Sequence, residues 1–194
     1  MSNRVTELHS IMPIANIASV LKYGILSHDK AKGLSHSDVS LAAVQDRREK
    51  KEVPNGLKLH QYANLYFHAR NPMMYKRLNQ VNELCVLRIS KQVINFPGVV
   101  LTDQNAASDY VRFLLPSEYE KIDFDWVYAD DWRDSDQITQ WRKASAKCAE
   151  VLVPNSVDTS YIQGAYVVGD SVQETLRQHG FKELITVNPT LFFR

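Results

Sequence analysis

Cysteine, glycine and proline are scarce in this chain of 194 residues, which has only two, seven and seven of them. Cys85 and Cys148 stand far apart, and neither belongs to a CxxC motif or a Cys/His cluster, so a zinc site is not expected. Both cysteines lie within apolar runs, which is typical of a buried, reduced thiol. The spacing of the other possible ligands predicts no metal site either.

Long apolar runs are also missing. No stretch approaches the roughly 20 apolar residues of a membrane span, and the N-terminal sequence MSNRVTELHS lacks the apolar core of a signal peptide. Neither sign of charge dominates, since 23 basic and 22 acidic side chains leave a net charge of +1. We therefore expect a cytoplasmic protein without a membrane partner, in which any nucleic-acid binding depends on a local basic patch.

Two nucleotide-binding motifs are absent. Neither GxGxxG nor GxxxxGK[ST] occurs, which excludes a Rossmann fingerprint and a P-loop. Hydrophobic residues make up 44% of the chain and charged residues 23%, as in soluble domains that bury a core. Because the length suits one domain and no repeat or low-complexity linker interrupts it, a single domain is predicted over residues 1–194.

Short strands and short helices alternate without a regular βα repeat, which favours a mixed α+β fold. Residues 27–62 are polar and weakly periodic, which indicates a functional loop or a mobile segment. Strands are predicted at 5–10, 25–26, 63–68, 84–89, 98–101, 148–153, 161–168 and 184–187, and helices at 13–23, 38–49, 72–78, 105–115, 135–147 and 171–179.

Glu150 is the most informative single residue. It lies inside the apolar stretch 149–153 on a predicted strand, where a carboxylate is costly unless it is paired or faces a cleft. The alternative interpretation is an outward-facing position on an edge strand. No second carboxylate stands out as its partner.

Other polar segments are candidates for the same site, and each also has a purely structural interpretation. The basic run 47–51 has guanidinium groups suited to phosphate oxygens, but it can equally be a solvated helix end. The remaining candidates lie where a predicted strand ends, and they are His9, Ser10, Arg70, Asn71 and the segment 102–107, which can also be a turn with an N-cap.

Five segments, taken in order, resemble the DarT family of DNA ADP-ribosyltransferase toxins. They are LHSIMPIANIASVLKYGILSH at 8–28, VQDRREKKEVP at 44–54, LHQYANLYFHARNPMMYK at 59–76, LTDQNAASDYVRF at 101–113 and CAEVLVP at 148–154. Together they extend over nearly the whole chain. RNPMMY with its preceding LYFHA and the late AEVLVP are fairly specific in combination, whereas each alone is a weak signal.

The resemblance implies an ADP-ribosyltransferase-like fold, with two central mixed β-sheets that form an NAD⁺ cleft and helices around them. It implies that Glu150 is the catalytic glutamate and that Arg47 is the essential arginine, with the neighbouring Arg48 as the alternative. Residues 27–54 correspond to the element that covers the dinucleotide, and the long segment before Glu150 to the loop that shapes the target-base site. The residues implied to hold NAD⁺ are His9, Ser10, Asn16, Leu26, Arg47, Arg48, Tyr66 and Met73.

The implied activity is transfer of ADP-ribose from NAD⁺ to a base of single-stranded DNA, with release of nicotinamide. A macrodomain antitoxin that removes the modification is the implied partner. Thymidine-modifying members tend to have Ser, His and Phe where this chain has Asn71, Asn105 and Val151, so the resemblance favours guanine, with thymine as the alternative. The candidate substrate-binding residues are Arg70, Asn71, Asn105, Arg142 and Lys143.

Side chains suited to single-stranded DNA are present between residues 76 and 147. The aromatic residues Trp126, Tyr128, Trp132 and Trp141 can stack on bases or lie buried. The basic residues that can line a groove for the DNA backbone are Lys76, Arg77, Arg112, Arg142, Lys143 and Lys147.

Two other functions remain open from the residues alone. An RNA 2′-phosphotransferase-like enzyme would transfer a phosphate from RNA to NAD⁺ and would not depend on Glu150. A non-enzymatic nucleic-acid-binding module would ignore NAD⁺ and would bind with a steep salt dependence. Thermal stabilisation by NAD⁺ separates this module from both enzymes.

Overall fold

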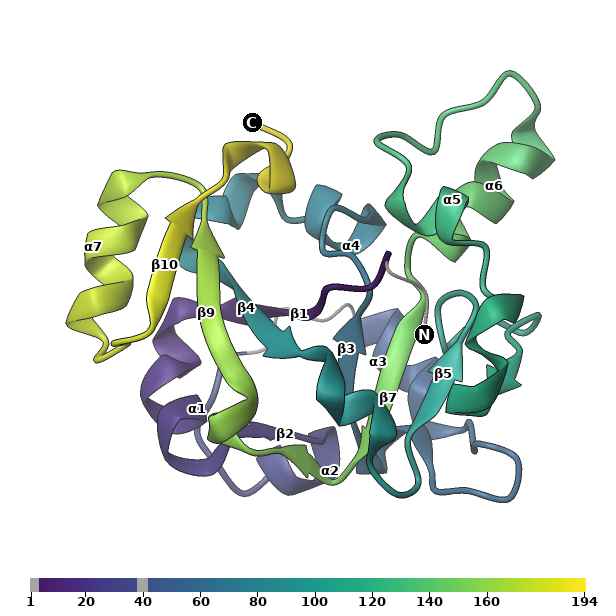
Figure 1. Cartoon of the computed structure of the whole chain (residues 1–194), viewed down its shortest axis with the longest axis horizontal. Coiled ribbons are helices and arrows are strands. Elements are labelled where there is room, and N and C mark those ends of the chain that lie inside the picture. The colour runs from purple at the N-terminus through teal and green to yellow at the C-terminus, as the bar shows by residue number, and fades with distance from the viewer. Residues whose placement is uncertain (1–3, 38–41) are drawn as a thin grey trace.

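The computed structural model describes residues 4–37 and 42–194. An eight-stranded mixed sheet, in the order β10-β9-β4-β1-β3-β7-β5-β6, lies at the centre (Figure 1). Its neighbouring strands are antiparallel except for β9 and β10, which are parallel. The strands are β1 Glu7–Pro13, β3 Tyr62–Tyr66, β4 Leu84–Ser90, β5 Val100–Thr102, β6 Phe113–Leu114, β7 Glu150–Pro154, β9 Ile162–Val167 and β10 Leu184–Val187.

One residue pair joins the two halves of this sheet. β1 pairs with β4 along seven residues, from Glu7 to Pro13, whereas it meets β3 only at His9 and Tyr66. No further ladder hydrogen bonds join these two strands, and one buried core packs against both halves. The resemblance implies two central sheets, whereas the structure has one continuous eight-stranded sheet whose halves meet at this pair.

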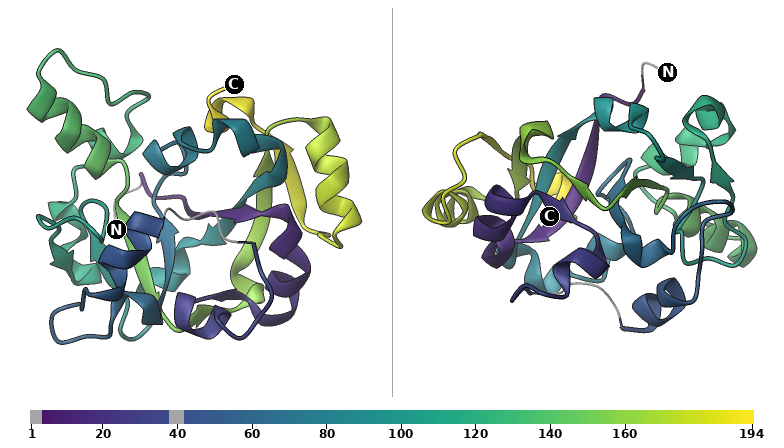
Figure 2. Two further views of the ribbon diagram at one scale, coloured as in Figure 1. Left: turned by 180° about the vertical axis from the view of Figure 1, so that it is seen from behind. Right: turned by 90° about the horizontal axis from the view of Figure 1, so that it is seen from below.

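Helices surround the sheet, and a two-stranded sheet of β2 (Ile25–Leu26) and β8 (Ser156–Val157) lies beside it. Seen from behind, α3 lies in front of the strands that hide it in Figure 1 (Figure 2). The helices are α1 Ile17–Tyr23, α2 His28–Ala31, α3 Ala42–Glu49, α4 Pro72–Tyr75, α5 Phe124–Tyr128, α6 Gln137–Ala146 and α7 Asp170–Gln178. Short 3-10 helices are η1 Ile14–Asn16, η2 Leu59–Gln61, η3 Leu78–Glu83, η4 Lys91–Asn95, η5 Pro116–Lys121, η6 Thr159–Tyr161 and η7 Pro189–Phe192.

The helix starts follow from local chemistry. Asn71 caps α4 by accepting a hydrogen bond from the Met74 N–H at 3.1 Å, and Pro72 occupies its first turn, where a missing N–H costs nothing. Asp136 caps α6 in the same way, with the Thr139 N–H at 2.8 Å. These polar residues before apolar runs are why the predicted starts of both helices lie within one or two residues of the observed ones.

The helix predicted at 105–115 is wrong. The chain makes turns there and then forms the short strand β6. Asn105 Oδ1 accepts from the Ala107 N–H at 2.8 Å, and the Ala106 N–H donates to a side chain of β7. The backbone then makes isolated turns, with the Ser108 N–H donating to the Asn105 carbonyl at 2.9 Å and the Val111 N–H to the Ser108 carbonyl at 3.4 Å, in place of a continuous helical ladder. Of the helix predicted at 38–49, residues 38–41 lie outside the described residues, and the remainder contains α3.

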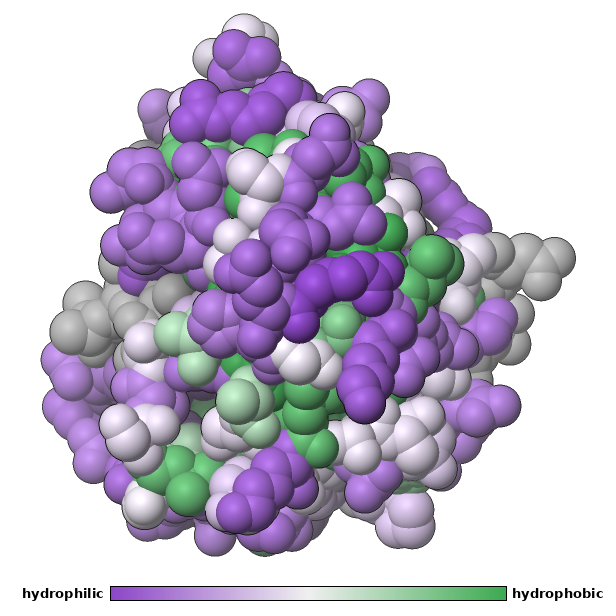
Figure 3. Space-filling view, turned by 90° about the vertical axis from the view of Figure 1, so that its left-hand side faces the viewer, coloured by the Kyte–Doolittle hydropathy of each residue, from purple (hydrophilic) through white to green (hydrophobic). Residues whose placement is uncertain are grey.

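The main core joins both halves of the sheet. Leu8 of β1, Leu65 of β3, Val151 of β7 and Ala165 of β9 belong to one buried cluster, against which Leu176 of α7 packs. Cys85 and Cys148 are both buried and free, as expected from the sequence. Beside α7 the surface is mainly hydrophilic, with apolar side chains in small groups among polar ones (Figure 3). Burial is therefore concentrated between the sheet and its helices.

Gly24 is expected to be irreplaceable at the turn between α1 and β2. Its φ is +79°, and an added Cβ would lie 2.2 Å from the Val157 carbonyl oxygen of β8. We expect Gly24→Ala to lower the free energy of unfolding by more than about 1 kcal/mol, measured by urea denaturation. Gly33→Ala is the control, because nothing lies within 4 Å of its added Cβ. Equal stability of the two variants would contradict this role.

Candidate active site

Glu150 begins β7, which lies between β3 and β5 inside the sheet. Its side chain is 1% exposed, so the alternative of an outward-facing position on an edge strand is wrong. Across the β3–β7 ladder Glu150 is the register partner of Tyr66, and Tyr66 is in turn the partner of His9 on β1. The buried carboxylate therefore lies one strand away from the junction of the two sheet halves.

The charge of Glu150 is compensated by two donors. Arg48 Nη1 lies 3.0 Å from Oε2 and 3.3 Å from Oε1, and the Ala106 N–H donates to Oε1 at 3.0 Å. A buried ion pair is tolerated where its geometry is good and further hydrogen bonds satisfy it. The Glu150 N–H donates to Thr102 Oγ1 at 2.9 Å, which fixes the backbone of the first residue of β7.

The two neighbouring arginines of α3 have different surroundings. Arg48 is 6% exposed and reaches Glu150, whereas Arg47 lies on the exposed side of the helix. Successive helical residues point about 100° apart, so only one of the two can point into the fold. His60 Nε2 lies 2.9 Å from Gln45 Oε1, which ties η2 to the same helix. The geometry pairs the carboxylate with Arg48.

A cleft of about 270 Å³ lies against Glu150, with one wall formed by β1 and another by β3 and β7. Eight residues that the resemblance implies for the site line it, and they are Ser10, Asn16, Leu26, Arg48, Tyr66, Met73, Asn105 and Glu150. Its lining is polar and apolar in similar measure, as in sites for nucleotide-sized ligands.

Tyr66 and Cys148 add weakly acidic groups to this cleft. Burial, followed by the neighbouring Glu150, raises the pKa of Tyr66 well above its usual range, so the phenol keeps its proton. Burial and Glu150 likewise raise the pKa of the Cys148 thiol to about 12. A thiol that stays protonated is a poor nucleophile, and Cys148 is therefore part of the wall rather than of the chemistry.

His9 does not line this cleft. Its Nδ1 accepts a hydrogen bond from the Ala69 N–H at 3.0 Å, so its ring proton is on Nε2, which lies 3.1 Å from Glu7 Oε1. Burial alone would raise the pKa of Glu7, but hydrogen bonds from His9, Arg88 and Tyr166 outweigh it and hold that pKa at about 2. His9 is thus fixed between a backbone donor and a carboxylate.

The five candidate substrate-binding residues are spread over the structure. Asn105 lines the cleft, whereas the buried Asn71 caps α4 and donates to the His68 carbonyl at 3.0 Å. Arg70 bonds to the carbonyls of Asp130 and Thr190. Lys143 is paired with Asp134 at 2.6 Å, and Arg142 is exposed on α6. Of the five, only Asn105 is brought together with Glu150.

Some residues of the cleft were not predicted as its members. Asn64 is a polar residue within the apolar strand β3, which is the same signal that marks Glu150. Gln45 stands two residues before the arginine pair and has no such signal. The Ala106 N–H that donates to Glu150 is a backbone group. Residue type gives no indication of such a contact, because every residue except proline has a backbone N–H. The remaining unpredicted side chains of the lining include Ser37, Lys76, Arg77 and Cys148.

The described residues contain neither a candidate membrane span nor a candidate metal site. No helix there combines the length and apolar character needed to cross a membrane. Within the same part of the chain, no group of three or more His, Cys, Asp or Glu side chains is placed to hold a metal ion.

Comparisons with known proteins agree with this geometry. A curated DNA ADP-ribosyl transferase–DNA ADP-ribosyl glycohydrolase fusion protein of Thermosipho africanus (strain H17ap60334) is 32% identical over 206 residues, which cover 100% of this chain and 51% of that protein. The chain thus spans about half the length of that relative. A DNA ADP-ribosyl transferase of Thermus sp. (strain 2.9) is 27% identical over 190 residues, which cover 89% of this chain and 88% of the relative.

Solved structures show the same fold. Thermosipho africanus DarTG in complex with ADP-ribose superposes with a TM-score of 0.85 at 28% identity, over 96% of this chain and 51% of that chain. Thermus sp. 2.9 DarT in complex with ADP-ribosylated ssDNA gives 0.82 at 23% identity, over 98% of both chains. The same protein with NAD⁺ gives 0.77 at 21% identity, over 98% of this chain and 99% of that one. The expected mixed α+β, ADP-ribosyltransferase-like fold is confirmed, with one large mixed sheet at its centre where two sheets were expected.

The family model described as "ssDNA thymidine ADP-ribosyltransferase, DarT" matches residues 9–193, which include the whole site. The chain therefore belongs to the DarT family.

Proposed function

We propose that this chain transfers ADP-ribose from NAD⁺ to a base of single-stranded DNA and releases nicotinamide. The observation that carries the proposal is the buried Glu150 carboxylate, paired with Arg48 on the wall of a cleft at the junction of the two sheet halves. The relatives support it, since the Thermus sp. 2.9 structures contain NAD⁺ in one case and ADP-ribosylated ssDNA in another.

Glu150 is proposed to act on the ribose that loses nicotinamide. Breaking that bond builds positive charge on the sugar, in an oxocarbenium-like transition state. A carboxylate held beside the sugar stabilises this charge and can accept a hydrogen bond from the ribose hydroxyl. Because Arg48 and Ala106 already hold both carboxylate oxygens, the group needs little reorganisation when the charge develops.

The pyrophosphate of NAD⁺ needs cationic donors in the same cleft. Lys76 and Arg77, which follow α4, line it and are suited to phosphate oxygens. We propose that Arg48 is the essential arginine, because it touches the carboxylate, in preference to the neighbouring Arg47. Met73 and Tyr66 supply apolar and aromatic surface for the planar parts of the dinucleotide.

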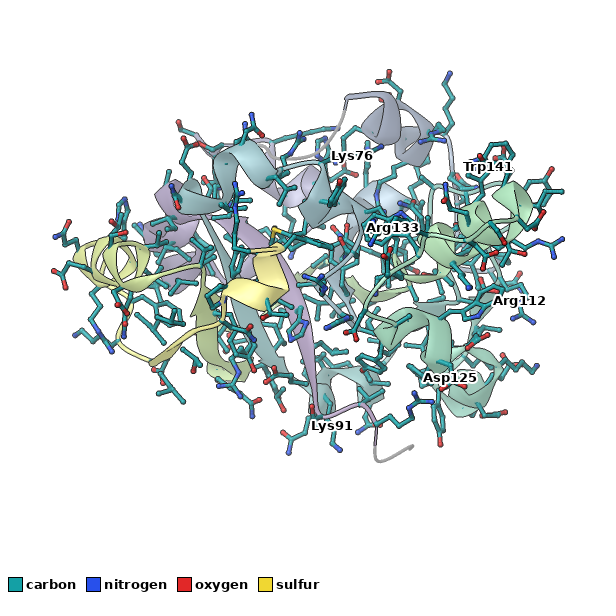
Figure 4. The ribbon with its side chains drawn as sticks, turned by 90° about the horizontal axis from the view of Figure 1, so that it is seen from above. Lys76, Lys91, Arg112, Asp125, Arg133 and Trp141 are labelled. Atoms are coloured by element: carbon teal, nitrogen blue, oxygen red, sulfur yellow. The ribbon has the colours of Figure 1, made fainter. Side chains whose placement is uncertain are left out.

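The DNA is proposed to approach over the part of the molecule that carries Lys76, Arg133 and Trp141; in Figure 4 Lys76 and Arg133 lie near the middle of the view and Trp141 at its right-hand end. Trp141 is 65% exposed and is available for stacking on a base, whereas Trp126, Tyr128 and Trp132 are half-buried. The earlier candidate Lys147 is fully buried, and its ammonium bonds to the carbonyls of Val127 and Ala129. It is therefore unavailable to the DNA backbone.

The target base is proposed to be guanine, with thymine as the alternative. The description of the matching family model names thymidine, whereas residues 71, 105 and 151 depart from the thymidine-type pattern. Of these three, Asn105 alone lines the cleft, and its amide can pair with a base edge.

A glycohydrolase that removes the modification is the proposed partner. The Thermosipho africanus relative is by name a transferase–glycohydrolase fusion, and this chain corresponds to 51% of it. We propose a macrodomain antitoxin in that role.

The test is direct. The protein is incubated with NAD⁺ and a short single-stranded oligonucleotide that contains all four bases, and the product is weighed by mass spectrometry and then digested to nucleosides. We expect a gain of one ADP-ribose, located on deoxyguanosine. An adduct on thymidine would replace the base assignment but keep the reaction, whereas an unmodified oligonucleotide would refute the proposed function.

A further inference from the structure

A second cavity, of about 230 Å³, shares no lining residue with the Glu150 cleft, and its lining includes one member of the pair that joins the sheet halves. Tyr66 lines the Glu150 cleft, whereas its partner His9 lines this second cavity, which we name the His68 pocket. His68 follows β3, Tyr128 comes from α5, and Tyr166 comes from β9. The His68 pocket therefore adjoins the reaction cleft and is bounded in part by the segment that precedes Glu150.

Five rings surround the His68 pocket. The ring centroids of His68 and Tyr128 are 5.4 Å apart, those of His9 and His68 are 6.1 Å apart, and those of His9 and Tyr166 are 5.9 Å apart, with Phe67 completing the wall. Aromatic faces of this kind accept a flat ring of any identity by stacking. The rings that line the pocket therefore favour a ligand with a planar ring.

His68 provides an unused acceptor within these rings. Its Nδ1 is buried and has no hydrogen-bond partner among the residues described. Burial, followed by the positive charge of Lys147, lowers the pKa of His68 to about 3, so the ring is neutral at physiological pH. A contact with the Val127 backbone acts in the opposite direction on this pKa. A neutral imidazole has one donor and one acceptor nitrogen, and we assign the acceptor role to the unpartnered Nδ1. Such a buried acceptor is costly unless a donor fills it.

The size and charge of the pocket limit which ligands could donate a hydrogen bond to His68 Nδ1. One water needs only about 10–15 Å³ by the same measure, so a single bridging water would leave most of the space empty. No Lys or Arg lines the pocket, and the Glu7 carboxylate does, which disfavours phosphate or any other anion. An uncharged planar ring with an N–H edge meets all of these conditions, and unpaired nucleobases have such edges.

We propose that the His68 pocket binds one unstacked nucleobase of the single-stranded DNA, beside the base that is modified. The N–H edge of this base donates to His68 Nδ1 and its faces lie against Tyr128 and Tyr166. That the bound polymer is single-stranded DNA rests on the proposed function, whereas the pocket itself is a feature of the structure. Because His68 would bind only bases with an N–H at that edge, the pocket is expected to give the enzyme a preference for certain bases at the nucleotide next to the modified one.

The test compares His68→Phe, which keeps the ring and removes the acceptor, with His68→Gln, which restores an acceptor. The matched control is His179→Phe, an exposed histidine at the end of α7 that lines neither cavity. Affinity for the oligonucleotide is measured by fluorescence anisotropy without NAD⁺, and KM is measured separately for NAD⁺ and for the oligonucleotide. We expect His68→Phe to weaken oligonucleotide binding about tenfold, as expected for one lost base contact, with the KM for NAD⁺ unchanged and partial recovery in His68→Gln.

Unchanged oligonucleotide binding in His68→Phe would overturn the proposal, and so would a rise in KM for NAD⁺ alone, which would place the nicotinamide ring in the pocket. If His68→Phe fails to fold, Tyr128→Leu tests the same pocket from the opposite wall, with the same expected loss. Failure of the proposed function is recognised separately, because it appears as a wild-type protein that binds oligonucleotide without modifying it. Binding then still decides whether His68 contacts a base.

Discussion

Glu150→Gln is expected to lower the rate of ADP-ribose transfer to DNA by at least about 100-fold, in line with the loss of one preorganised electrostatic group. The amide keeps the shape of the side chain and can still accept from the Ala106 N–H, but it cannot offset positive charge on the sugar. Arg48 loses its counter-charge, so a lower melting temperature is also expected. Transfer is measured by oligonucleotide mass under conditions where the variant is folded.

The control for this variant is Glu49→Gln, an exposed carboxyl at the end of α3. It is expected to keep wild-type activity and stability. NAD⁺ binding by Glu150→Gln is followed by thermal shift, because the proposal assigns the carboxylate to the reaction rather than to general binding. A Glu150→Gln protein that retains more than about a tenth of wild-type transfer, a cost of under 1.4 kcal/mol, would remove Glu150 from the reaction.

Arg48→Ala is expected to destabilise the protein by about 3–5 kcal/mol, because it leaves a carboxylate buried without its ion-pair partner. Arg47→Ala changes an exposed position of the same helix and is expected to shift the free energy of unfolding by no more than about 0.5 kcal/mol. Urea denaturation of both variants measures the difference. Equal effects, or a larger effect at Arg47, would contradict the pairing seen in the structure.

Loss of activity in Arg48→Ala would not by itself separate chemistry from folding. The double variant Arg48→Met/Glu150→Leu makes that separation, because apolar replacement of both partners of a buried ion pair is often neutral for stability. We expect it to recover most of the stability lost in Arg48→Ala and to have no transferase activity. A double variant as unstable as Arg48→Ala would show that the ion pair is not the cause of the instability.

Glu150 could be found from the sequence because an ionised group inside an apolar strand demands a compensating partner. Its partner could not be found by the same reasoning, since Arg48 is 102 residues away. The choice between Arg47 and Arg48 depends on the rotation of α3 about its axis, and weak periodicity left this rotation undetermined. The resemblance indicated the helix that carries the ion-pair partner of Glu150, but not which of its two arginines pairs with the carboxylate.

The longer strands followed from apolar runs, and β10 was predicted at its observed bounds, residues 184–187. The two-residue strands β6 and β8 were not predicted. The helix predicted at 105–115 is not formed. The composition of this segment permits a helix, but its conformation depends on a distant contact, the hydrogen bond from the Ala106 N–H to Glu150 of β7. The second cavity was not foreseen either, because its walls come from β1, β9, α5 and the turn after β3. Contacts between residues so far apart in the sequence cannot be predicted from the local pattern of apolar and polar residues.

The seam between the two sheet halves has a single register pair, His9 and Tyr66, and one buried core packs beneath both halves. The Glu150 cleft takes its lining from both halves, with Ser10 from β1 and Tyr66 and Glu150 from β3 and β7. We therefore expect substitutions in the core beside this seam to alter the width of the cleft without touching any residue that lines it.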